Sequence, residues 1–159
     1  MKRWCFAVAV ACLCVVTGDG TFAVGENAPS VLGVGPGAGI GAGRTFTFVY
    51  TAADGASDIA TTQAIISTSL TGDHACYFHA ADNRFWLRND DGTEWVGPVG
   101  AGSARALRNS QCKLWASGSS VAATGDRLTM NVVLTFAMSF AGDRTIRMKA
   151  TDREGIASD

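Results

Sequence analysis

The stretch that decides the fold covers residues 74–89 and reads HACYFHAADNRFWLRN. On both sides of the turn segment 81–83, inward and outward positions alternate residue by residue, which is the pattern of two half-buried strands joined by a turn. The antiparallel hairpin that this pattern predicts points four side chains to the protein interior: Cys76, Phe78, Phe85 and Leu87. Since successive side chains of a strand point to opposite faces, the residues between them form a second, outward face.

That outward face carries aromatic and basic side chains: Tyr77, His79, Arg84, Trp86 and Arg88. A flat aromatic ring flanked by guanidinium groups suits the apolar side of a sugar ring, so these residues form a candidate ligand face. The same pattern is typical of a cross-strand cation–π ladder that only covers the sheet. The sequence leaves both interpretations open. We expect the nearby Trp95, which stands beside Gly97-Pro98, to lie in the core or at a corner.

Period-two alternation of this kind recurs along the chain, and no segment after residue 18 shows a long helical period of apolar residues. The further strands that it predicts cover residues 44–51, 59–70, 110–115, 127–140 and 144–151, with an edge strand at 31–34. Gly, Asn and Asp separate these runs, as they do in turns. The sequence therefore predicts an all-β fold, an antiparallel immunoglobulin-like β-sandwich of about seven to nine strands with very little helix.

The N-terminus has the pattern of a secretory signal peptide. Lys2 and Arg3 precede 13 uncharged residues, 4–16. This run is too short for a transmembrane helix, which needs about 20 apolar residues. We expect a signal peptide over residues 1–18, with its end as late as residue 23, and hence a protein that is secreted or held at the cell surface.

Two further segments follow the signal peptide. Residues 19–43 are rich in Gly and Ala and read as a lead-in, and residues 44–159 are long enough for one domain. An alternative reading of the N-terminus takes Ala9 to Cys12 as a lipoprotein signal. The protein would then contact a membrane through a lipid on Cys12.

The cysteine count agrees with export. Three of the five cysteines, Cys5, Cys12 and Cys14, lie within the signal peptide and leave with it. Cys76 and Cys112 remain. An exported chain with two cysteines most simply forms one disulfide between them, so we predict a Cys76–Cys112 bond.

Charge and motifs exclude several classes of partner. The formal net charge is -1, so no basic excess points to nucleic acid. Residues 35–45, GPGAGIGAGRT, contain a relaxed dinucleotide-binding pattern at Gly37, Gly39 and Ala42. Such a fingerprint must open a helix, whereas residues 45–50 alternate like a strand. We therefore expect no nucleotide and no cofactor, and we interpret this stretch as a pliable connection.

Short motifs recur through the chain in a characteristic order. They are PS at 29–30, TFTF at 45–48, DG at 54–55, DI at 58–59, SL at 69–70, ACY at 75–77, NDDGTEWVGP at 89–98, NSQC at 109–112, GSSV at 118–121, FAG at 140–142 and ATDREG at 150–155. In this order they resemble an immunoglobulin-like repeat of many secreted bacterial proteins, Acidobacteria among them. The resemblance implies the fold and the location. It implies no chemistry, since that family is functionally uncharacterised.

Metal-binding patterns are weak. On the predicted strand His79 faces away from His74 and Cys76, so we expect no zinc or copper site. The weak calcium candidates are Asp54, Asp58 and Asp152. They are considered because residues 150–155 resemble the closing strand of cadherin-like repeats, whose aspartate helps to bind calcium. The other cadherin motifs are missing.

No catalytic constellation is apparent. The chain lacks G-x-S-x-G, and its two histidines lie on one predicted strand, so a Ser/His/Asp arrangement has few possible bases. We expect a secreted or cell-surface module that is not an enzyme and has a structural or adhesive role. The alternative is a carbohydrate-binding module that uses the aromatic and arginine face. A lesser alternative is a calcium-stabilised adhesion domain. The expected partner is a glycan or another surface protein.

Overall fold

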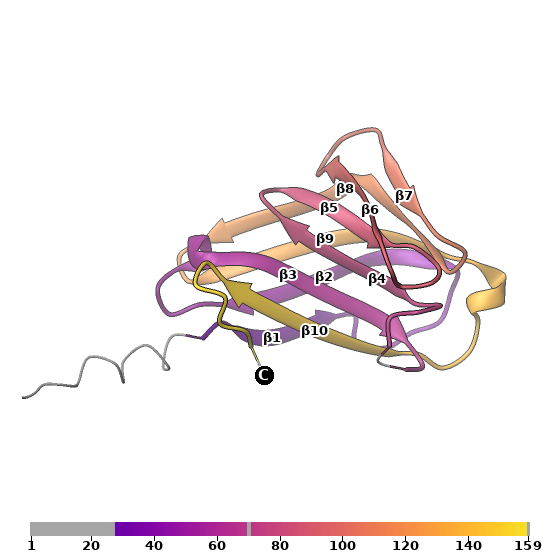
Figure 1. The fold of residues 1–159 in the computed structure, drawn as a ribbon, viewed down its shortest axis with the longest axis horizontal. Coiled ribbons are helices and arrows are strands. Elements are labelled where there is room, and N and C mark those ends of the chain that lie inside the picture. Colours follow the sequence, from indigo (N-terminus) through magenta and orange to yellow (C-terminus); the bar gives the residue numbers. More distant parts are fainter. Residues whose placement is uncertain (1–27, 70, 159) are drawn as a thin grey trace, which may run out of the picture.

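A computed structural model describes residues 28–69 and 71–158, which form two antiparallel sheets of five strands stacked face to face (Figure 1). The front sheet has the order β10 (Thr145–Asp152), β3 (Ile59–Ser67), β4 (Cys76–Ala81), β5 (Arg84–Arg88) and β6 (Trp95–Gly100). The rear sheet has the order β1 (Ser30–Gly35), β2 (Gly43–Thr51), β9 (Arg127–Phe136), β8 (Cys112–Thr124) and β7 (Ala106–Arg108). The described secondary structure also includes two short 3-10 turns, η3 (Ala56–Asp58) and η4 (Met138–Phe140).

The predicted antiparallel β-sandwich is confirmed, and the structure corrects its details. The described residues hold ten strands rather than about seven to nine. The two that we did not predict, β6 and β7, read WVGPVG and ALR. Glycine and proline interrupt β6, and β7 is only three residues long. Neither strand therefore shows a clear alternation.

The sandwich also begins earlier than residue 44. Strand β1 lies inside the expected lead-in and pairs with β2 along its length, with a bulge between Val31 and Gly33. Val31 and Val34 pack against the core. The glycines that we read as a loose connection extend from the end of β1 at Gly35, through the link, to the start of β2 at Gly43.

The core fills the space between the two sheets. Phe48 of the rear sheet meets Phe78 of the front sheet edge to face, with ring centroids 5.6 Å apart. Tyr50, Leu134 and Met130 are likewise fully buried. The four side chains predicted to point inward from the hairpin, Cys76, Phe78, Phe85 and Leu87, have no exposed surface. Period-two alternation therefore assigned the faces of this hairpin correctly.

The predicted Cys76–Cys112 disulfide is confirmed, with an S–S distance of 2.01 Å and a Cα–Cα distance of 5.6 Å. Cys76 begins β4 and Cys112 begins β8, so the bond joins the front sheet to the rear sheet. It closes a loop across the core rather than within one sheet.

The side chain of Asn109 makes a second bridge beside the disulfide. Its amide nitrogen donates to the carbonyl oxygens of Ala75 at 2.9 Å and Arg88 at 3.0 Å. Its amide oxygen accepts from the backbone N–H groups of Gln111 at 3.0 Å and Cys112 at 2.9 Å. One partly buried side chain thus ties the front sheet to the start of β8.

A two-residue turn sets the register of the β4–β5 hairpin. Ala81 pairs with Arg84, so the turn consists of Asp82 and Asn83 rather than the three residues 81–83. Both have positive φ, 46° and 60°, as a type I′ turn requires, and Asn and Asp tolerate this region better than other non-glycine residues. This register places His79 directly opposite Trp86.

The expected signal peptide and the lipidation site at Cys12 lie outside the described residues. Within residues 28–69 and 71–158, no helix is long and apolar enough to cross a bilayer.

Candidate functional site

Two rows of side chains cross the outward side of the front sheet, which we call the front face. Strand register places Lys149 opposite Gln63, Gln63 opposite His79, and His79 opposite Trp86. These four residues form the first row. Since β10, β3, β4 and β5 are neighbours, the row runs perpendicular to the strands across most of the sheet.

The second row runs beside the first. Arg147 lies opposite Ile65, and Ile65 lies opposite Tyr77. Arg88 continues the row from Tyr77, with its guanidinium carbon 5.9 Å from the tyrosine ring centroid, and Arg88 pairs with Trp95. Each row therefore begins with a cation on β10 and ends at a tryptophan.

Four rings meet where the two rows end. His79 packs against Trp86 with centroids 4.6 Å apart and the ring planes tilted by 31°, and it meets Trp95 edge to face at 4.2 Å. Tyr77 also meets Trp95 edge to face, at 5.0 Å. The Arg88 guanidinium lies 4.2 Å from the Trp95 ring centroid. Arg88 and the four residues that carry the rings are partly exposed, so they form a continuous apolar and cationic surface.

We expected Trp95 to lie in the core or at a corner. The structure instead places it on this surface. A register shift between Phe85 and Leu87 re-aims the start of β6. Gly97 makes this possible, because it has a φ of +130° and a Cβ there would lie 3.0 Å from the Phe85 carbonyl oxygen. The bulge depends on pairing between strands, so the sequence around Trp95 did not reveal its direction.

Burial lowers the proton affinity of His79, the histidine at the centre of this cluster. Burial, with the nearby Arg88 guanidinium as the second cause, lowers the pKa of His79 from 6.5 to about 4. The imidazole is therefore neutral at physiological pH. The Arg88 Nε atom is buried and has no hydrogen-bond partner within the described residues, so it is held by stacking on the rings.

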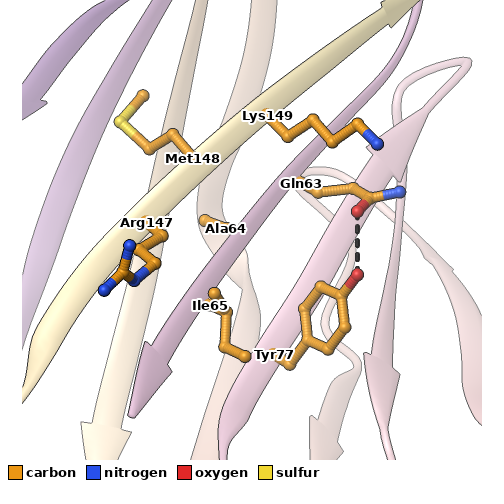
Figure 2. A pocket seen from close by; sticks show the side chains of 7 residues that line it. All are labelled: Gln63, Ala64, Ile65, Tyr77, Arg147, Met148 and Lys149. Carbon is orange, nitrogen blue, oxygen red and sulfur yellow. Dashed lines mark hydrogen bonds between the residues drawn. The ribbon is translucent and has the colours of Figure 1, made fainter. Parts of the chain in front are cut away.

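Beside the ring cluster lies a hollow of about 200 Å³ between β10, β3 and β4 (Figure 2). The only charged residues that line it are Arg147 and Lys149, and both are basic. Tyr77 lines one side of it and donates its hydroxyl hydrogen to Gln63 Oε1 at 2.8 Å. The hollow thus connects the aromatic end of the face to its cationic end.

Of the predicted ligand face, the structure brings together Tyr77, His79, Trp86 and Arg88. Arg84 lies apart from the ring cluster, exposed at the start of β5 and paired with Ala81 and Gly100. The face also includes Trp95, Gln63, Arg147 and Lys149, which our sequence reasoning did not include. Gln63, Arg147 and Lys149 alternate correctly within their own strands, but only the register shows which residues they neighbour.

The weak calcium candidates Asp54, Asp58 and Asp152 are not gathered into one group of ligands. Within the described residues, no group of three or more His, Cys, Asp or Glu side chains is arranged to hold a metal ion. The buried Asp152 carboxylate accepts hydrogen bonds from the backbone N–H groups of Glu154 at 2.9 Å and Ile156 at 2.7 Å. The structure therefore uses this aspartate to close the turn that follows β10.

The glycine-rich connection that resembles a dinucleotide fingerprint lines a second hollow, of about 1000 Å³, at one end of the sandwich. Arg44, the basic residue of this stretch, donates to the carbonyl oxygens of Ala38 at 3.4 Å and Ile40 at 2.7 Å. Its guanidinium is therefore engaged in holding the loop, and the segment leads into strand β2 rather than a helix.

The fold and the front face together define a disulfide-linked β-sandwich with an aromatic and basic surface on one sheet. Comparison with known proteins finds no matching family, no matching curated protein and no matching solved structure. The geometry of the front face is therefore the basis for the function proposed below.

Proposed function

We propose that this protein is a secreted, non-enzymatic β-sandwich module that adheres to glycans through its front face. The observation that carries this proposal is the cluster of Trp86, Trp95, His79 and Tyr77, which pack against one another and are partly exposed on the outward side of one sheet. Phe48 and Phe78, by contrast, pack inward and are fully buried in the core. The disulfide is compatible with an extracellular location.

The shape of the face suits a sugar chain. The apolar side of a pyranose ring packs on a flat indole, while its hydroxyl groups accept hydrogen bonds from neighbouring donors. Arg88 lies 4.2 Å from the Trp95 ring and Gln63 lies one strand from His79, so donors flank the rings. The adjoining hollow is shallow and lies along the sheet, as expected for contact with a polymer rather than enclosure of a small molecule.

The same face favours binding over catalysis. Among the described residues of the five front strands, the only carboxylate belongs to Asp152, which is buried and hydrogen-bonded to a turn. Glycoside hydrolysis normally requires two carboxyl groups flanking the bond. His79 lacks a carboxylate partner on this face, so no acid–base pair is assembled there. We therefore propose adhesion without turnover.

The test compares Trp86→Ala with Trp115→Ala on a glycan array and in pull-down with insoluble polysaccharides. Trp115 is the matched control, because it is a partly exposed tryptophan on the rear sheet that carries its own cation, Lys113, 3.5 Å from its ring. Trp86→Ala should reduce glycan retention about tenfold or more, equivalent to roughly 1.4 kcal/mol, and Trp115→Ala should not. The proposal fails if the parent protein retains no glycan, or if both substitutions have the same effect.

A further inference from the structure

We propose that the glycan bound by the front face is acidic, and that it lies across the strands along the row Lys149–Gln63–His79–Trp86. A sugar ring would stack at the Trp86 end, and a carboxylate or sulfate group would be bound at the Lys149 end. This inference rests on the proposed function and names its class of ligand.

The placement of charge, rather than its amount, supports an acidic ligand. Each sheet carries four basic residues on its described strands. On the rear sheet Arg44 is engaged by loop carbonyls and Lys113 lies over Trp115. On the front sheet Arg147 and Lys149 both line one hollow, with no acidic residue among its lining. A hollow bordered by charges of one sign attracts an ion of the opposite sign.

Hydrogen-bond direction makes this hollow a donor site. Tyr77 donates its hydroxyl hydrogen to Gln63 Oε1, so the Gln63 amide oxygen is engaged and its NH₂ group is left to donate. Figure 2 shows the Lys149 ammonium extending on the same side as this amide group, and the Tyr77–Gln63 bond is the only hydrogen bond among the residues drawn. An ammonium and an amide NH₂ group offer hydrogens only, and therefore select an acceptor such as a carboxylate or sulfate.

The length of the row selects a chain over a single sugar. Neighbouring strands lie about 4.8 Å apart, so the three intervals from Lys149 to Trp86 span roughly 14 Å. A group bound at Lys149 and a ring stacked on Trp86 therefore belong to different residues of an oligosaccharide. Arg147, which is two positions from Lys149 on β10 and on the same face, provides a second cation for a further acid group.

The experiment uses affinity gel electrophoresis of the full mature chain in two polymers with the same backbone. Polygalacturonate carries a carboxylate on each sugar, and its highly methyl-esterified form has lost that charge. We expect the parent protein to bind the acidic polymer about tenfold more tightly at low ionic strength. This preference should shrink as salt is added, because exposed charges are screened over about 10 Å at 0.1 M. Binding to heparin tests whether the Lys149 end of the row accepts a sulfate group in place of a carboxylate.

Three variants locate the effect. Lys149→Gln, which removes the charge and keeps most of the side chain, should lower binding of polygalacturonate about five- to tenfold and leave the esterified polymer unaffected. Trp86→Ala should weaken binding of both polymers. Lys113→Gln removes a cation that lies beside a tryptophan on the rear sheet and should change neither.

The outcomes separate the two proposals. If the parent binds both polymers equally, or Lys149→Gln has no effect, the acidic ligand is wrong while glycan binding stands. If Lys113→Gln weakens binding as much as Lys149→Gln, the attraction is nonspecific and the site is wrong. Poly-L-glutamate is the charge control: binding as tight as that of polygalacturonate would overturn recognition of a sugar. If neither polymer nor heparin binds, the acidic-glycan inference fails. Trp86-dependent retention of another glycan would still support the proposed function.

Discussion

The two outward faces of the sandwich are built on the same antiparallel pleat and differ in how their polar groups are used. On the rear face, neighbouring side chains satisfy one another. Thr47 Oγ1 donates to Asn131 Oδ1 at 2.7 Å, and Asn131 Nδ2 donates to Ser120 Oγ at 3.2 Å. Trp115 donates its indole N–H to Thr135 at 2.7 Å. This ladder stabilises the sheet and leaves few groups for a ligand.

The front face is aromatic and cationic instead. Its rings pack against one another, while the Gln63 amide group and the Lys149 ammonium make no hydrogen bond to each other in Figure 2. Donors that a fold leaves unused at the surface are available to a partner. The comparison supports the proposal that the front sheet binds a ligand, although the described strands of the two sheets carry equal numbers of basic residues.

The largest effect is expected from the bond that joins the two sheets. Replacing both Cys76 and Cys112 by Ala should lower the free energy of unfolding by about 4 kcal/mol, as the chain-entropy model gives for a loop with a sequence separation of 36 residues. Urea denaturation followed by tryptophan fluorescence measures this. The parent protein in reductant should show a similar loss of unfolding free energy. Equal urea midpoints with and without reductant would contradict a stabilising disulfide.

A smaller effect is expected at the side-chain bridge between the sheets. Asn109→Ala removes four hydrogen bonds that join Ala75 and Arg88 to the start of β8, and should cost about 2–3 kcal/mol because buried partners lose their bonds. Asn109→Asp keeps the two acceptor bonds but sets an ionised carboxylate oxygen against the carbonyl oxygens of Ala75 and Arg88, so at neutral pH it should cost at least as much. If both variants unfold at the parent's urea midpoint, the bridge is not a structural element. Since Asn109 also holds the backbone of Arg88, Asn109→Ala should disturb the arrangement of the side chains on the front face. The hydrogen-bonded side chains of the rear face should keep their arrangement.

The smallest effect is a pH dependence that belongs to the front face. Since the pKa of folded His79 is lowered to about 4 and its unfolded value is about 6.5, the unfolded chain binds a proton first. The free energy of unfolding should therefore fall as the pH is lowered from about 6.5 to about 4. Below that range His79 should cause no further loss. Because the side chain is about half exposed, we expect a loss of no more than about 1 kcal/mol.

Urea midpoints measured from pH 7 to pH 4 test this dependence. His79→Gln should remove part of the acid sensitivity. The control is His74→Asn, because His74 is exposed at a positive φ of 50° that Asn also tolerates. An identical pH profile for the parent and His79→Gln would show that burial of this imidazole has no energetic consequence.

The comparison of the two faces also shows how far the sequence could be read. Alternation identified the inward and outward sides of β4 and β5, because a side chain's face in a strand depends only on its position relative to its neighbours. The disulfide followed from the cysteine count. Strands β6 and β7 were not predicted, because glycine, proline and short length conceal alternation. Trp95 was placed wrongly, because the bulge that directs it arises from pairing with β5.

The sequence by itself determined the all-β class, the disulfide, and the aromatic and basic character of the hairpin's outward face, since each is a property of local pattern or of composition. Only the tertiary structure decided which residues join that face. Lys149 and Gln63 are separated by 86 positions and Gln63 and Trp86 by 23, yet they form one row. Strand order and register create this row, and a one-residue slip in register would turn each strand's side chains to the opposite face. The proposed ligand site therefore depends on pairing between distant strands, which no single stretch of sequence contains.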